Sequence, residues 1–261
     1  MTTPAPSSPR PAFAVRLPLY PLRLTYVLLA VVTMVFVAQY VSQMVWHLDL
    51  VMLIGAKYSR LIAHGQLWRL FTPIFIHAGW WHFLLNAYAL YNLGTEIERT
   101  HGAMRLGLIF LLSGVSGTVA STLFSPAISV GASGAIFGLI GALGVFLYRN
   151  RNLFGERGRR SLQNVIAIAG MNLFLGMTME GIDNWAHIGG LVGGVMLSWF
   201  IGPVWEVPLE KERVFFGDRG TAAEPLVLTD KQPLDGMRWM TVGLAWLGLL
   251  LLAGLAIVLQ L

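Results

Sequence analysis

The chain has 261 residues, of which 56% are hydrophobic and only 12% are charged. A soluble domain carries about 25% charged residues, so this composition excludes an ordinary soluble protein and indicates an integral membrane protein. The absence of cysteine excludes disulfides and thiolate metal sites. The net charge of +5 lies in segments between apolar stretches, so we attribute it to membrane topology rather than to nucleic-acid binding.

Seven apolar stretches follow one another along the chain, each long enough to cross or nearly cross a bilayer. The second of them is short and contains His82 and Asn86. The pattern predicts an all-α membrane protein with a six-helix core and a seventh, C-terminal transmembrane helix. The stretches are 23–45, 81–95, 104–124, 132–149, 161–179, 185–203 and 239–260.

The predicted organisation has four parts. Residues 1–22 form a Pro- and Ser-rich tail without the pattern of a cleavable signal peptide. Residues 23–203 hold the six-span core, in which 46–80 is interpreted as an outer loop partly sunk in the membrane interface. Residues 204–237 are interpreted as a cytoplasmic linker, because this is the one long stretch of soluble character. Residues 238–261 form the seventh helix.

Lysine and arginine residues indicate the orientation of the chain. They gather in the N-terminal tail and in the segments after the second, fourth and sixth spans, which all lie on one side if there are seven spans. This side should be cytoplasmic, which places the N-terminus in the cytoplasm and the C-terminus outside. The loop 46–80 is an exception, since it contains Lys57, Arg60 and Arg69. The compact chain and its short loops favour a bacterial inner membrane.

Polar side chains at membrane depth are costly, so each is a candidate functional residue. Ser133 begins the fourth span within the motif GASG, and His187 begins the sixth. No Asp or Glu lies inside a span, which excludes the paired carboxylates of an aspartyl protease, and the zinc motif H-E-x-x-H is absent. We interpret Asn164 and Asn172 in the fifth span as residues that hydrogen-bond to other helices.

Ser133 and His187 are chemically suited to act together, because a serine hydroxyl is a weak nucleophile that needs an adjacent base. His187 shares a helical face with Gly190 and Gly194, and small residues on one face let two helices approach closely. If the partner is the fourth span, His187 reaches Ser133 at a similar depth. No carboxylate is available to orient the histidine, so the pair is predicted to be a dyad.

A developing oxyanion at Ser133 would need hydrogen-bond donors. The backbone N–H of Ser133 lies at a helix N-terminus, where the helix dipole favours negative charge. His82 and Asn86 lie one turn apart on the second span and offer side-chain donors. Gly131 and Gly134 keep the backbone open around the serine.

These residues resemble the rhomboid family of intramembrane serine proteases, and the resemblance covers residues 23–203. One of the motifs alone would be weak, but four occur in order and at plausible spacing. They are WR at Trp68-Arg69, HAGWWHFLLN at 77–86, GASG at 131–134 and AHIGGLVGG at 186–194.

The resemblance implies a role for each of these residues. Ser133 is the nucleophile, His187 the general base, and His82 and Asn86 the oxyanion-stabilising pair. Phe137 packs on the catalytic histidine, at a position where the family often has tyrosine. The remaining motif residues are structural: Trp68, Arg69, His77, Gly131, Gly134, Gly190 and Gly194.

The function implied by the resemblance is hydrolysis of peptide bonds in or next to the transmembrane segments of membrane-protein substrates, which enter from the lipid bilayer. Water is the only co-substrate, so neither a cofactor nor a metal is expected. The first alternative is a catalytically inactive relative that binds membrane-protein clients. A transporter or channel is disfavoured by the lack of intramembrane carboxylates and of internal repeats. The sequence leaves the physiological substrate and the oligomeric state open.

Overall fold

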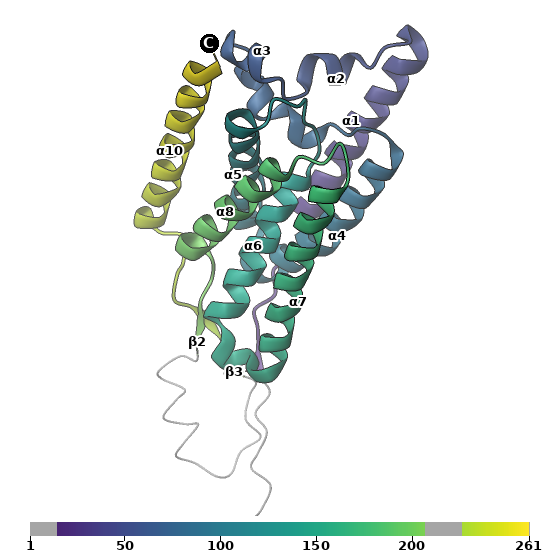
Figure 1. The fold of residues 1–261 in the computed structure, drawn as a ribbon. Coiled ribbons are helices and arrows are strands. Elements are labelled where there is room, and N and C mark those ends of the chain that lie inside the picture. Colours follow the sequence, from purple (N-terminus) through teal and green to yellow (C-terminus); the bar gives the residue numbers. More distant parts are fainter. Residues whose placement is uncertain (1–14, 207–225, 261) are drawn as a thin grey trace, which may run out of the picture.

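The structure, a computed structural model, describes residues 15–206 and 226–260, and within these it is built almost entirely from helices (Figure 1). Four of the described helices, α1, α5, α7 and α10, are long and apolar enough to cross a membrane, and α6 is a shorter apolar helix. Together with the low charged fraction, they identify an integral membrane protein. The long helices are α1 (Leu24–Trp46), α4 (Trp80–His101), α5 (Ala103–Phe124), α6 (Ser133–Arg149), α7 (Arg151–Thr178), α8 (Asn184–Ile201) and α10 (Gly236–Gln260).

Each apolar stretch forms one of these helices, but two boundaries differ from the prediction. Helix α4 continues to His101 and so includes the charged residues beyond position 95. The predicted connector at 150–160 is helical, because α7 already begins at Arg151. Gly155 interrupts this first part with a φ of 52°, a backbone conformation that glycine adopts without a steric penalty.

The interpretation of Asn172 as an interhelical residue was wrong. Its side-chain amide donates to the carbonyl oxygen of Ile168, one turn earlier in the same helix, at 2.8 Å. Asn164 is exposed on α7. Among the described residues, no hydrogen bond from either of these two amides joins α7 to another helix, and α7 is largely exposed along its length.

Helix α6 lies at the centre of the bundle, in contact with α4, α5, α7 and α8. Its contact with α8 is made by glycines on both helices. A methyl group added at Gly190 would lie 1.9 Å from the carbonyl oxygen of Gly134, and one at Gly194 would lie 2.0 Å from that of Gly138. The two backbones therefore touch directly, as the glycine pattern predicted.

The segment between α1 and α4, predicted as a loop, contains four short helices: α2 (Leu50–Gly55), α3 (Ser59–Ala63), η1 (Leu67–Leu70) and η2 (Thr72–Phe75). The last carbonyl oxygens of a helix have no hydrogen-bond donors within it. At the end of α2, side chains act as these donors. Trp68, Arg69 and Thr72 donate hydrogen bonds of 2.6–3.0 Å to the four consecutive carbonyl oxygens of residues 53–56. The motif Trp68-Arg69 thus fastens α2 to η1.

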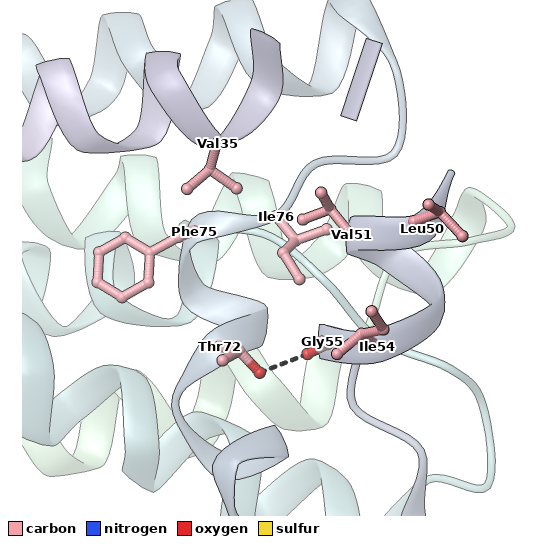
Figure 2. Close-up of a pocket in the computed structure, with 8 residues that line it drawn as sticks. All are labelled: Val35, Leu50, Val51, Ile54, Gly55, Thr72, Phe75 and Ile76. Atoms are coloured by element: carbon pink, nitrogen blue, oxygen red, sulfur yellow. Dashed lines mark hydrogen bonds between the residues drawn. The ribbon is translucent and has the colours of Figure 1, made fainter. Parts of the chain in front are cut away.

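An apolar pocket of about 350 Å³ lies between α1, α2 and η2 (Figure 2). Val35 reaches it from α1, Leu50 and Val51 from α2, and Phe75 from η2. The Thr72 hydroxyl at its edge is already bonded to the Gly55 carbonyl. The pocket offers apolar surface only, and none of the predicted site residues lines it.

Of the predicted linker 204–237, residues 207–225 lie outside the described residues, and the described parts at its two ends pack against the bundle. Strand β2 (Trp205–Glu206) pairs antiparallel with β4 (Thr229–Asp230), and β1 (Val15–Arg16) pairs parallel with β3 (Leu226–Val227). These short strands lie at one end of the bundle, and the short helices α2 and α3 lie at the other (Figure 1).

Two arginines of the bundle hold the folded linker. Arg105 of α5 forms an ion pair of 2.7 Å with Asp230, and both side chains are almost buried. Arg149, the last residue of α6, donates to the side chain of Gln232 at 2.9 Å. From this attachment α10, yellow in Figure 1, runs along α5 and α8 and reaches α3. Its Trp246 meets Phe71 edge to face, with ring centroids 5.5 Å apart.

Candidate active site

The structure brings Ser133 and His187 together. Ser133 is the first residue of α6, and His187 lies in the first turn of α8. The Ser133 Oγ is 2.9 Å from the His187 Nε2, and the histidine is buried. This separation is that of a nucleophile and a base that share a proton. It follows from the direct backbone contact between α6 and α8.

The His187 ring is held by stacking rather than by a hydrogen bond on its other side. Phe137 lies one turn after Ser133 on α6, and its ring stacks on the imidazole at a centroid distance of 4.3 Å and an interplanar angle of 14°. Among the described residues, the His187 Nδ1 has no hydrogen-bond partner. Phenylalanine has no hydroxyl, so this contact orients the ring by its shape alone.

A carboxylate lies nearer to His187 than the sequence indicated. Asp183 is the N-cap of α8, and its Oδ1 accepts a hydrogen bond of 3.2 Å from the Ala186 N–H. Its backbone carbonyl accepts from the N–H of His187 at 3.2 Å. The second carboxylate oxygen accepts from the hydroxyl of Ser121 in α5. Asp183 therefore joins the start of α8 to α5 without bonding the imidazole.

His82 lies across from Ser133, and Gly131 lies between them. Gly131 has a φ of 124°, and a methyl group there would be 2.6 Å from the His82 Nε2 and 3.7 Å from the Ser133 Oγ. The backbone N–H of Ala78 points at the His82 Nδ1 at 3.3 Å. Because Nδ1 is thereby an acceptor, the neutral ring assigned from this bond carries its proton on Nε2. A donor therefore faces the space beside the serine.

Asn86 is buried on α4, one turn after His82. Its amide nitrogen donates to the backbone carbonyl of His82 at 2.8 Å, which uses one of its two hydrogens. Within the described ranges no hydrogen bond joins Asn86 to Ser133 or to His187. The structure thus places His82 at the candidate site, whereas it shows Asn86 bonded only to the His82 carbonyl among the described residues.

His77 is fully buried and fixed through its backbone. Its N–H and its carbonyl oxygen both bond to the side-chain amide of Gln39, each at 3.0 Å. Its ring lies edge-on to that of His82, with centroids 5.3 Å apart. Burial, followed by the neighbouring His82, lowers the pKa of His77 to about 4 against the opposing effect of the Phe75 carbonyl. The imidazole of His77 is therefore neutral near pH 7 and lies against that of His82, and its structural role stays a prediction.

Lys57 is a second residue, besides Asp183, that the sequence analysis missed. It was noted only as an exception to the charge pattern, yet its side chain is completely buried. Its Nζ donates to the carbonyl oxygens of Ser125 at 2.6 Å and Ala127 at 2.9 Å. Its backbone exchanges two hydrogen bonds with Ser129, at 3.0 and 3.2 Å. The available signal was a lone lysine in an apolar stretch without a nearby acidic residue.

Comparisons with known proteins cover the part of the chain that holds the candidate site. Residues 64–204, which hold Ser133, His187, His82 and Asn86, match the family model of the rhomboid domain. Rhomboid protease GluP of Bacillus subtilis is 40% identical over 68% of this chain and 34% of its own length. RHOMBOID-like protein 1 of Arabidopsis thaliana is 36% identical over 72% of this chain and 47% of its own. The matches thus span about a third to a half of these relatives, and the chain belongs to the rhomboid family.

Proposed function

We propose that this protein is an intramembrane serine protease that hydrolyses peptide bonds in or next to transmembrane segments of membrane proteins. The observation that carries the proposal is the 2.9 Å contact between the Ser133 Oγ and the His187 Nε2. This contact lies inside the matched rhomboid domain, and a relative at 40% identity is named a protease.

The geometry supports a reaction in two steps. His187 takes the proton of Ser133 as the serine oxygen attacks the scissile carbonyl carbon, and then gives this proton to the leaving amine. Water next attacks the acyl-enzyme, with His187 again as the base, and Ser133 is regenerated. Neither step needs a metal or a cofactor.

The oxyanion of each tetrahedral intermediate would lie between Ser133 and His82. Ser133 is the first residue of α6, so its backbone N–H has no acceptor within that helix. The Nε2–H of His82 faces the same space from α4, and Asn86 can add its free amide hydrogen. Such donors stabilise the charge that develops in the transition state.

The topology that we propose is the one that the distribution of lysine and arginine indicates. Helices α1, α4, α5, α6, α7 and α8 form the six-span core, and α10 is the seventh span. The N-terminus and the folded linker lie in the cytoplasm, while the C-terminus and the Ser133 end of the bundle lie outside. We place the protein in a bacterial inner membrane, with transmembrane proteins as its substrates.

The test is labelling of purified full-length protein with a fluorophosphonate, which reacts with activated serines, followed by cleavage of a model transmembrane substrate. We expect wild type to be labelled and to cleave, and Ser133→Ala and His187→Ala to do neither. If folded wild type does neither, the protease proposal is wrong. Client binding that survives loss of Ser133 would then support the inactive alternative.

A further inference from the structure

The end of α5 is the meeting point of three segments that lie far apart in the sequence. Ser121 donates its hydroxyl to Asp183 at the start of α8. One turn later, Ser125 ends the helix, and its carbonyl oxygen accepts from the buried Lys57 ammonium. The Ser125 N–H itself bonds to the Ser121 carbonyl at 2.8 Å, so both contacts share one helical turn.

Lys57 hydrogen-bonds to the segment that precedes Ser133. Its side chain holds two carbonyls of the segment 125–131, and its backbone pairs with Ser129 in the middle of that segment. The segment ends at Gly131, whose N–H donates to the Pro73 carbonyl at 2.9 Å. Ser133 follows two residues later. The position of the serine thus depends on a segment that Lys57 holds at three residues, Ser125, Ala127 and Ser129, through four hydrogen bonds.

Asp183 fixes the backbone around His187 by hydrogen bonds at the start of α8. It caps α8 through the Ala186 N–H, and its own carbonyl receives the His187 N–H. A carboxylate one turn from the imidazole would also stabilise the imidazolium that forms when His187 takes the serine proton. His82 on α4 is the other titratable group that acts on His187, and it carries no negative charge.

Lys57 and Asp183 also interact with each other. Burial lowers the pKa of Lys57 to about 8, and the negative charge of Asp183 opposes this shift. The two opposite charges therefore attract one another electrostatically across the end of α5.

We propose that Lys57 and Asp183 are positioning residues that act as one brace: through the end of α5, they hold Ser133 and His187 at reacting distance. The inference rests on the proposed function, since it assigns these two residues to the same site. Among the described residues, neither side chain hydrogen-bonds to the side chain of Ser133 or His187, so their effect would be indirect. Their loss should slow the chemical step, because a displacement of about 1 Å at reacting groups can cost on the order of 100-fold in rate.

The experiment measures the rate constant of fluorophosphonate labelling at Ser133 and, with a transmembrane substrate, kcat and KM separately. The variants are Lys57→Met, Asp183→Asn and the double variant, with Ser133→Ala as the blank. Asparagine caps helices as well as aspartate does, so Asp183→Asn removes the charge but keeps the cap. Arg60→Met is the matched control, because Arg60 is an exposed cation in the same segment.

We expect each single variant to lose about tenfold or more in labelling rate and in kcat, with KM nearly unchanged. The double variant should lose less than the product of the two single losses, because residues of one network are not additive. Arg60→Met should stay within about twofold of wild type. Thermal unfolding of every variant checks that folded proteins are compared. If Lys57→Met does not fold, the labelling rate of Asp183→Asn alone tests the proposal.

Three outcomes would overturn the inference. Labelling of the folded single variants at the wild-type rate would show that the brace does not position the dyad. Fully multiplicative losses would show that the two residues act separately. Absence of labelling in wild type would reject the proposed function and this inference with it, whereas the first two outcomes leave the protease proposal standing.

Discussion

His82 is the residue whose chemistry is most sharply defined by its neighbours. The Ala78 N–H occupies its Nδ1, so the Nε2 is left as a donor towards the space beside Ser133. A protonated Nε2 in this place suits an oxyanion but not a second base. This tautomer supports the oxyanion role that we propose for His82.

Replacement of His82 tests this assignment. We expect His82→Leu to lower kcat by about 10²–10³-fold with little change in KM, as for the loss of one oxyanion donor. His82→Gln, which restores an N–H, should recover part of this loss. Asn86→Leu should have a smaller effect, since one of its two amide hydrogens is bonded to the His82 carbonyl. Equal activity of the leucine and glutamine variants at position 82 would contradict the donor role.

The buried Lys57 makes stability depend on pH in the alkaline range. Its pKa is about 8 in the folded protein and near 10.5 in the unfolded chain. Between these values the unfolded chain binds a proton that the folded protein does not, so stability rises with pH. Wild type should therefore gain up to about 3 kcal/mol relative to Lys57→Met between pH 8 and 10.5. Unfolding measured at several pH values checks this, and a constant difference between the two proteins would disprove it.

At the scale of elements, the long helices follow directly from apolar runs, which is why each of them could be predicted from the sequence. The short helices between α1 and α4 could not, because α2 is held by side chains from a segment about fifteen residues later. The pairing of Ser133 with His187 was predictable because the glycines of α6 and α8 indicate close contact. The roles of Lys57 and Asp183 were not, since they depend on where α5 ends in space.

The contact between α6 and α8 can be tested by comparing a glycine that is tightly packed against backbone with one that has space for a methyl group. A methyl group at Gly194 would lie 2.0–2.5 Å from the backbone of Gly138, which cannot move aside. We expect Gly194→Ala to cost about 1–3 kcal/mol in stability, as overpacking does, and to slow labelling of Ser133.

Gly144 of α6 is the matched control for this substitution. The nearest atom to an added methyl group there is 3.8 Å away, in ordinary contact. Because alanine is the better helix former by up to about 1 kcal/mol, Gly144→Ala should be neutral or stabilising. Thermal unfolding of the two variants provides the comparison, and a similar loss in both would contradict the backbone contact described above.

At the scale of the whole molecule, the folded linker and α10 form a second attachment on the bundle. Arg105 and Asp230 are nearly buried, and Asp230 also accepts from the Val204 N–H at 3.1 Å. Removing one partner of a buried ion pair leaves an uncompensated charge, which costs about 3–5 kcal/mol. The position of α10 should depend on this pair.

Asp230→Ala tests the attachment of α10. The chain contains no cysteine, so the substitutions Phe71→Cys and Trp246→Cys introduce a single pair where α10 meets the residue that follows η1. We expect this pair to react with a short bifunctional thiol reagent in the otherwise unchanged protein, and much less when Asp230→Ala is added. Unchanged cross-linking after Asp230→Ala would show that α10 is held without the linker.

The pairing of β1 with β3 has a consequence for biosynthesis. The two strands are separated by most of the chain, since Val15 pairs with Leu226. A ribosome that has completed α8 has already produced both Ser133 and His187, whereas the partner of β1 is still missing. The helices can thus meet during translation, but the strand end of the bundle closes only after the linker has emerged, as expected for contacts of such long range.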